Sequence, residues 1–273
     1  MTGNEDRSYA AQLAACAVLM APITRAAIGV LGLPPGSSGL DAGCGIGLQT
    51  IALAEAVGPR GAVAAVDLNP ALLAEARQRA GIAGVSDRLS LEMADVQHLP
   101  YASSRFDWAW SGDCVGYGVP DPAAAAGELA RVVRPGGLVA LLVWSSQTLL
   151  PGYPRLEARL NATAPGLAPF AAGRPPERHH LRGLGLLREV GLVETRARTI
   201  AGDAHAPLDD PRRAALTALI GMRWLGAETE LSREDAAEFR RLCDPGSPEF
   251  LVDHPDYYAC FTETLFWGRV RPV

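Results

Sequence analysis

The chain has 273 residues, of which 48% are hydrophobic and 20% are charged, so it can bury a sizeable core and is not a disordered chain. Its formal net charge of −5 argues against a general nucleic-acid binder and against binding to anionic membrane surfaces. The five cysteines form no C-x-x-C pair, which argues against a zinc site and predicts a reducing, cytoplasmic location.

The N-terminal segment predicts one or two helices over residues 9–31. They lie in an apolar run, 10–33, that is interrupted by Gln12, Pro22 and Arg25. We interpret this run as amphipathic helix. No segment of the sequence is expected to be long and apolar enough to span a bilayer.

A glycine-rich loop follows the first predicted strand, 38–42, and precedes a helix predicted over 47–57. Its pattern D-x-G-x-G-x-G departs from the G-x-G-x-x-G spacing of dinucleotide-binding loops. Glycines let a ligand lie against bare main chain, so the loop predicts a cradle for a nucleotide-type cofactor. An acid at its first position would repel a pyrophosphate and suits a cationic amino group. The loop residues expected at the cofactor are Asp41, Gly43, Cys44, Gly45 and Gly47.

Three further strands, 62–67, 89–94 and 106–111, are predicted beyond the loop. The first of them ends in Asp67, about twenty residues past the loop, where a carboxylate can accept hydrogen bonds from ribose hydroxyls. The next residue, Leu68, is expected to pack on an adenine face. These positions extend the predicted cofactor site along the carboxyl ends of the strands.

A helix over 122–132, a Pro-Gly-Gly turn and a strand over 137–144 follow, with the sequence E-L-A-R-V-V-R-P-G-G beginning at Glu128. Five segments in this order, over residues 38–144, resemble the class I S-adenosylmethionine-dependent methyltransferases. Any one of them would fit an ordinary strand-turn-helix joint of an α/β protein. Five in order favour the family.

The resemblance implies S-adenosyl-L-methionine as the cofactor and an α/β fold with a Rossmann-like, seven-stranded, mostly parallel sheet whose last strand is antiparallel. The carboxylate of Asp95 would meet the adenine exocyclic amine, and the amide of Val96 would meet a ring nitrogen. Tyr9 could reach the cofactor from the N-terminal helices, and Ser111 would lie near its methionine end.

After Trp144 the sequence becomes rich in Pro, Gly and Ala. The elements predicted there are a helix over 181–190, a strand over 192–200, helices over 209–225 and 232–242, and a last strand over 257–270. We expect a single domain, 1–273, with 1–33 as a helical cover and two lid insertions, 145–180 and 202–256, after strands five and six. Extra packing or an oligomer interface is the alternative for these insertions.

The lids are expected to cover the acceptor and determine which acceptor is used. The apolar lid side chains expected to exclude water from the reacting centre are Leu149, Tyr153, Phe170, Met222 and Trp224. Methyl transfer needs an aligned acceptor about 3 Å from the methyl carbon, and a base only where the nucleophile carries a proton. No motif names that base. Asp113, just past the fourth strand, and His180 are the candidates, although a surface location is an alternative for His180.

The sequence thus predicts S-adenosylmethionine-dependent methyl transfer by in-line displacement to a small, apolar or aromatic natural-product-type acceptor. It resembles the ubiquinone/menaquinone methyltransferase-like branch. A non-methylating, pericyclase-like enzyme on the same scaffold is the alternative, and an NAD-dependent oxidoreductase is disfavoured by the loop spacing. No metal site, nucleic-acid partner or membrane partner is expected. The acceptor atom, whether oxygen, nitrogen or carbon, and homo-oligomerisation stay open.

Overall fold

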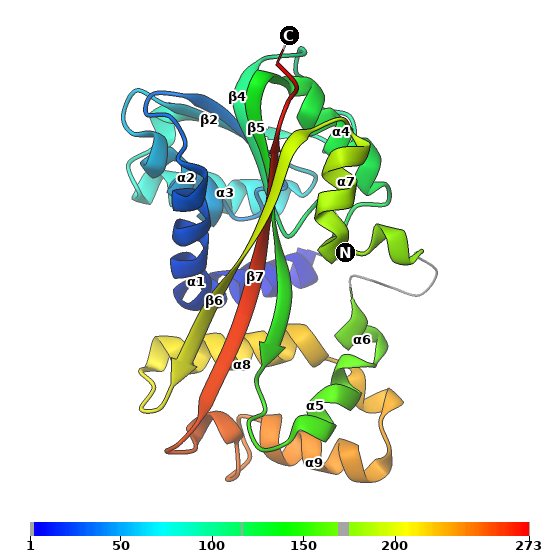
Figure 1. The fold of residues 1–273 in the computed structure, drawn as a ribbon. Helices are drawn as coiled ribbons and strands as arrows, with labels where there is room; N and C mark the ends of the chain where they lie inside the picture. The colour runs from blue at the N-terminus through cyan, green and yellow to red at the C-terminus, as the bar shows by residue number, and fades with distance from the viewer. Residues whose placement is uncertain (1–2, 116, 169–174, 273) are drawn as a thin grey trace.

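The computed structural model describes residues 3–115, 117–168 and 175–272, and its strands form one sheet in the order β3-β2-β1-β4-β5-β7-β6 (Figure 1). The strands are β1 (Ser38–Ala42), β2 (Ala62–Asp67), β3 (Leu89–Met93), β4 (Phe106–Gly112), β5 (Val133–Thr148), β6 (Val193–His205) and β7 (Tyr258–Arg269). β7 is antiparallel to both β5 and β6, whereas the other neighbours are parallel. The predicted fold class is confirmed.

Helices cover both faces of this sheet. They are α1 (Gly3–Leu31), α2 (Leu48–Val57), α3 (Pro70–Ile82), α4 (Pro122–Val132), α5 (Pro154–Asn161), α6 (Ala164–Leu167), α7 (Gly183–Glu189), α8 (Asp210–Trp224) and α9 (Arg233–Cys243). Helices α1, α2 and α3 contact one another, and α4 contacts α7. Figure 1 shows these two groups of helices on opposite sides of the strands.

The alternation of side chains along β5 explains this two-sided burial. Leu138, Ala140 and Leu142 belong to a core with α1 and α2, while Val139 and Leu141 belong to a core with α4 and α7. Successive side chains of a strand point to opposite faces, so a strand buried on both faces is apolar throughout. Local signals begin the helices, since Asn69 caps α3 and Asp121 caps α4, each followed by a proline.

β5 and β6 extend further than the sequence predicts, to Thr148 and His205 instead of 144 and 200. Both strands stay paired with β7 over this extra length, although the β5 register shifts between Trp144 and Ser146. The long strands reach α5, α8 and α9 in Figure 1. A separate hydrophobic core lies here, between α1, the insertions and the N-terminal end of β7. The insertions therefore fold against α1 and the extended strands.

The N-terminal segment forms one continuous helix, α1, with Pro22 inside it. By length and composition alone, Arg7–Leu31 is apolar enough to cross a membrane, so the prediction that no such segment exists was wrong on that criterion. In the fold, α1 contacts α2, β6 and α8, and it buries residues such as Ile23 and Ala27. Its apolar residues thus serve the protein core, a role that periodicity cannot separate from a membrane span.

Candidate functional site

A cavity of about 700 Å³ opens at the carboxyl ends of β1, β2, β3 and β4. In open α/β sheets this is the edge at which ligands bind. Nine of the eleven residues that the sequence predicts at the cofactor line it: Tyr9, Asp41, Gly43, Cys44, Gly45, Asp67, Leu68, Asp95 and Val96. Helix α1 closes one side through Tyr9 and Leu13.

The glycine loop after β1 has the backbone that its sequence requires. Gly43, Gly45 and Gly47 have φ values of 84°, 53° and 78°, a left-handed region that favours glycine. A Cβ atom at Gly43 would lie 2.3 Å from the sulfur of Cys114, so the loop needs the absence of a side chain there. Gly47 does not line the cavity. A Cβ atom there would lie 2.9 Å from that of Ala76, so its role is close packing of α2 on α3.

Asp41 places a carboxyl group with little solvent contact at the floor of the cavity. It is 1% exposed, and the hydroxyl of Thr50 donates a hydrogen bond of 2.6 Å to it. Burial raises the pKa of Asp41 to about 7, against the opposing hydrogen bond from Thr50, and nearby Asp67 raises it further. Among the described residues no cationic side chain pairs with this buried carboxyl group, which suits it to a ligand cation such as an ammonium group.

Asp67 stabilises the loop and also faces the cavity. Its two carboxylate oxygens accept hydrogen bonds from the backbone N–H of Gly45 at 2.8 Å and of Asn69 at 2.9 Å. A carboxylate offers about four acceptor positions, so two remain for ligand hydroxyls. The adjoining Leu68 is 63% exposed and lines the cavity, which leaves an apolar surface on which a planar ring can pack.

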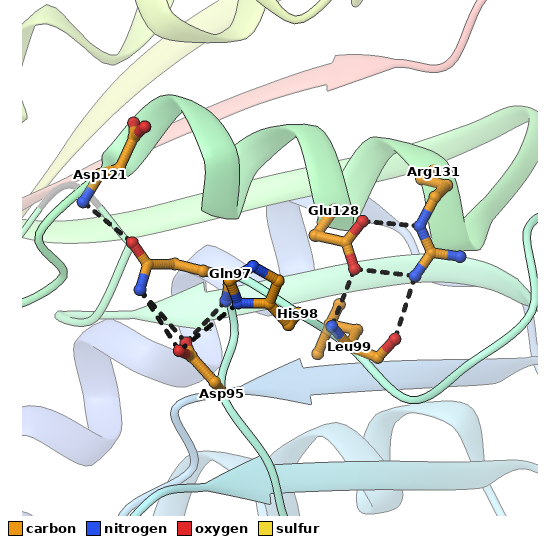
Figure 2. A network of polar contacts seen from close by, with 7 residues as sticks. All are labelled: Asp95, Gln97, His98, Leu99, Asp121, Glu128 and Arg131. Atoms are coloured by element: carbon orange, nitrogen blue, oxygen red, sulfur yellow. Dashed lines mark hydrogen bonds and ion pairs between the residues drawn. The ribbon is translucent and has the colours of Figure 1, made fainter.

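Asp95 and Val96 lie on a loop that the predicted E-x-x-R motif holds in place (Figure 2). The Glu128 carboxylate accepts from the Leu99 backbone N–H at 2.8 Å and pairs with Arg131, and Arg131 donates to the Leu99 carbonyl at 3.1 Å. The Asp95 carboxylate accepts from the backbone N–H of Gln97, which lowers its pKa. Asp95 is thus an anionic acceptor at the cavity rim.

Ser111 does not line the cavity, which differs from the prediction. It is 1% exposed; its hydroxyl donates to the Ala42 carbonyl at 2.8 Å and accepts from the Val115 N–H at 3.1 Å. The residue therefore ties β4 to β1 behind the site. Tyr9, in contrast, is 41% exposed and lines the cavity as predicted from the resemblance.

A second cavity of about 300 Å³ adjoins the first. The two share Leu13, Leu48, Gln49 and Asp113, so these residues mark the boundary where contents of the two cavities would meet. The second cavity is mainly apolar and lies between α1, α2, α8, β5 and β7. Beyond the shared residues its apolar lining includes Cys16, Met20, Trp144, Leu219 and Met222.

The two residues predicted for catalysis are placed differently. Asp113 lines both cavities. His180 lines neither; its ring stacks on His179 at 4.2 Å between centroids and meets Tyr117 edge-on at 5.0 Å. Burial lowers the pKa of His180 to about 4, which leaves the ring neutral. The structure therefore does not bring His180 to the predicted reacting centre. Its ring lies against Tyr117 and outside both cavities.

Of the side chains predicted to line a lid pocket, one lines a cavity and others are buried in a core. Met222 lines the second cavity. Leu149 and Trp224 are fully buried in the core of the insertions, where the Trp224 indole donates to the Asn161 side chain at 3.0 Å. Tyr153 packs on the same core, and Phe170 lies outside the described residues. The prediction that Trp224 faces the acceptor was wrong, because α8 turns it to the opposite side from Met222.

Four residues at the boundary or in the second cavity escaped the sequence-based prediction. Leu13, Leu48 and Gln49 lie on the shared boundary, where Gln49 also accepts a hydrogen bond of 2.6 Å from the Trp110 indole. Glu263 on β7 lines the second cavity although it is 2% exposed. A signal for Glu263 exists, since it is the single charged residue between 257 and 268. Carboxylates are almost never fully buried unless paired.

The residues of the first cavity fit the cofactor that the resemblance implies. The buried carboxyl group of Asp41, to which the Thr50 hydroxyl donates, suits the ammonium group in the methionine part of the cofactor. The acceptor oxygens of Asp67 and Asp95 suit ribose hydroxyls and an adenine amine, and the side-chain-free surface at Gly43 and Gly45 lets the ligand approach the main chain.

Comparisons with known proteins find methyltransferases. The family described as a methyltransferase domain matches residues 40–137. A demethylmenaquinone methyltransferase of Bacillus cytotoxicus is 35% identical over 124 residues, so the match spans 44% of this chain and about half, 50%, of that protein. The enzyme of the same name from Staphylococcus aureus (strain JH9) is 28% identical over 193 residues, 64% of this chain and 76% of that protein.

Solved structures share the fold at low identity. The candidate methyltransferase in a complex with the Haloferax volcanii Trm112 methyltransferase activator has a TM-score of 0.62 at 19% identity, with 100% of this chain and 99% of that chain covered. Haemonchus contortus Phospholethanolamine N-methyltransferase 2, solved with phosphomonomethylethanolamine and S-adenosylhomocysteine, has a TM-score of 0.54 at 17% identity and covers 92% of this chain and 53% of that one. The chain is therefore similar to methyltransferases in sequence over residues 40–137 and in fold, and the relatives that it resembles carry the name demethylmenaquinone methyltransferase.

Proposed function

We propose that the protein transfers a methyl group from S-adenosylmethionine to a small, apolar or aromatic acceptor that binds in the second cavity. The observation that carries this is the shared boundary: Leu13, Leu48, Gln49 and Asp113 line both cavities. An acceptor on one side of this boundary can therefore reach the reactive end of a cofactor on the other. The apolar lining supports an apolar acceptor, and so does the similarity to demethylmenaquinone methyltransferases.

The cofactor supplies an electrophilic methyl group on a sulfonium, and the chain supplies position and shelter. Asp41 would hold the cationic end of the cofactor and Asp67 and Asp95 its ribose and base, while the glycine loop would leave room for it against the main chain. Helices α1 and α8 cover the second cavity with Leu13, Leu219 and Met222 and exclude water there. In-line displacement then depends on how the boundary residues align the acceptor.

Two measurements test this proposal. Calorimetric titration should show binding of S-adenosylmethionine and S-adenosylhomocysteine, and preference for NAD would overturn the cofactor assignment. Incubation with a panel of hydroxylated, aminated and enolic aromatic compounds should give a product heavier by one CH₂ group for at least one class. A product of unchanged mass would instead support a pericyclase-like enzyme on the same scaffold.

The proposal extends to the surroundings of the protein. The acceptor is proposed to be a free small molecule of a natural-product type and not a nucleic acid, in keeping with the net charge of −5. All five cysteines are free, which is compatible with a cytoplasmic location. Cell fractionation of the source organism tests the location, and gel-shift assays with RNA and DNA test the acceptor class.

A further inference from the structure

Two carboxyl groups meet at the boundary of the two cavities. Asp113 follows β4 and lines both cavities, and Glu263 projects from β7 into the second. Glu263 is the direct neighbour of Trp144 in the β5–β7 ladder, and Trp144 donates its backbone N–H to Asp113 at 2.8 Å. The two carboxyl groups also interact, since the charge of Asp113 raises the pKa of Glu263 and the Glu263 side chain lowers that of Asp113. Two buried carboxyl groups that interact titrate as a pair, so they hold one proton between them while one of them is charged.

The protein fixes Asp113 in an uncommon backbone conformation. Its φ is 46°, in the left-handed region that residues other than glycine seldom adopt. Its backbone N–H donates to the Leu142 carbonyl at 2.8 Å, and its carboxylate accepts from Trp144, so β5 holds the residue at both ends. Such strain is found where the surrounding structure enforces it, often at functional sites.

Glu263 offers an acceptor atom that nothing in the described part of the chain occupies. The residue is 2% exposed, and its Oε2 atom is buried without a hydrogen-bond partner there. A buried acceptor left without a donor is unfavourable, so a ligand hydroxyl group that donates to Oε2 would be bound there.

The charges around the pair favour a neutral ligand. Desolvation raises the pKa of both carboxyl groups, and the charge of Asp113 raises that of Glu263 further, so Glu263 holds the proton and Asp113 the negative charge. The Arg223 guanidinium from α8 lowers the pKa of Asp113, which balances that negative charge. Tyr9 and Tyr117 also face Asp113 and stay protonated, because burial raises the pKa of each phenol.

We propose that the Asp113–Glu263 pair binds the hydroxyl group of a phenolic or enolic acceptor at Oε2 of Glu263 and takes up its proton during methyl transfer. This inference rests on the proposed function and names the chemical class of its acceptor. The Arg223 guanidinium already acts on the Asp113 charge, so a cationic amine in the apolar cavity would have to share that charge with it. A neutral hydroxyl group instead donates the hydrogen bond that Oε2 lacks.

The step balances in atoms and charge. The acceptor oxygen forms a bond to the methyl carbon while the carbon–sulfur bond breaks, and its electron pair stays on sulfur. The hydroxyl proton moves to the Asp113–Glu263 pair, whose one negative charge it neutralises. The pair thereby gains one proton and becomes neutral, the positive charge of the sulfonium is lost, and the products are a methyl ether and S-adenosylhomocysteine. After product release the pair returns one proton to water.

Binding to the S-adenosylhomocysteine complex separates this inference from activity. Calorimetry with 1-naphthol and with 1-methoxynaphthalene should show that wild type binds the hydroxyl compound about tenfold more tightly, the size of one hydrogen bond to a buried acceptor. Glu263→Met should reduce this preference to about twofold or less, while Glu263→Gln keeps a carbonyl acceptor and should retain it. Equal binding of the two probes by wild type, or tighter binding of 1-naphthylmethylamine, would overturn the inference.

Infrared difference spectra supply a second readout that does not depend on turnover. Naphthol binding should shift the band of a protonated carboxyl group, and Glu263→Gln should abolish that shift. Glu157→Gln is the matched control, because Glu157 is another buried glutamate, 6% exposed, that lines neither cavity. A naphthol-sensitive band lost in the Glu157 variant instead would refute the assignment.

Turnover then separates the two proposals from each other. Glu263→Gln should bind naphthol and S-adenosylmethionine normally yet lose most of its methyl transfer to hydroxyl acceptors, since the amide cannot take up a proton. Unimpaired transfer by this variant would contradict the proton step. Methylation of other acceptors by a wild type that shows no hydroxyl preference would leave the proposed function standing while the inference fails. Failure to bind S-adenosylmethionine would refute the proposed function itself.

Discussion

The buried carboxyl group of Asp41 makes cofactor affinity depend on pH near neutrality. Burial raises its pKa from the ordinary 3.8 to about 7. The ammonium group of the cofactor needs the carboxylate form, so binding below pH 7 must first release the proton. For one group with a pKa of 7, the dissociation constant increases about tenfold between pH 8 and pH 6, or about 1.4 kcal/mol.

Isothermal titration of S-adenosylmethionine at pH 8, 7 and 6 tests this. In two buffers of different ionisation enthalpy, the titration at pH 6 should also show release of nearly one proton for each cofactor bound. Asp41→Asn should bind more weakly at pH 8 and lose most of the pH dependence, because Asn does not titrate. Asp113→Asn, which removes the other carboxyl group of the first cavity with a raised pKa, should keep the dependence. A constant affinity for wild type, or an unchanged slope in Asp41→Asn, would refute the reasoning.

The same shift has a consequence for the ligand-free protein. A carboxyl group whose pKa is raised on folding contributes its full stability below the unfolded pKa near 4, and that stability decreases as the pH rises to about 7. Asp41→Asn should therefore raise the melting temperature of the ligand-free protein at pH 8, and less so at pH 5. Equal effects at the two pH values would show that Asp41 is not the titrating group.

Three further outcomes follow from the site. Gly43→Ala should lower both cofactor affinity and melting temperature, because its Cβ atom would lie 2.3 Å from the Cys114 sulfur at a φ of 84°; unchanged calorimetry would contradict the loop geometry. Trp224→Ala should cost about 3–5 kcal/mol in urea unfolding, as truncation of a buried aromatic residue does, whereas Met222→Ala should chiefly raise the acceptor KM; the reverse pattern would reverse their assignments. Asp67→Asn should weaken cofactor binding at least tenfold at an intact fold by circular dichroism, since hydrogen bonds to a charged group contribute about 1.5–3 kcal/mol each, and an unchanged affinity would place the ribose elsewhere.

Features encoded by neighbouring residues could be predicted from the sequence alone. The glycine loop beginning at Asp41, the strand that ends in Asp67 and the acidic position at Asp95 each depend on a few adjacent residues, and the structure places all three at one cavity. The strand and helix order follows from hydrophobic period and turn residues in the same local way. The antiparallel direction of the last strand also agrees with the prediction, which came from the family resemblance.

Features that depend on contacts between distant segments were decided only by the tertiary structure. Glu263 reaches Asp113 because β7 pairs with β5 in one particular register, and a shift of one residue would turn its side chain to the other face. Met222 and Trp224 are two residues apart on α8, and only the packing of α8 on α1 decides which faces the second cavity and which is buried. Sequence supplies the local conformations and residue chemistry, whereas long-range packing determines which side chains share a site.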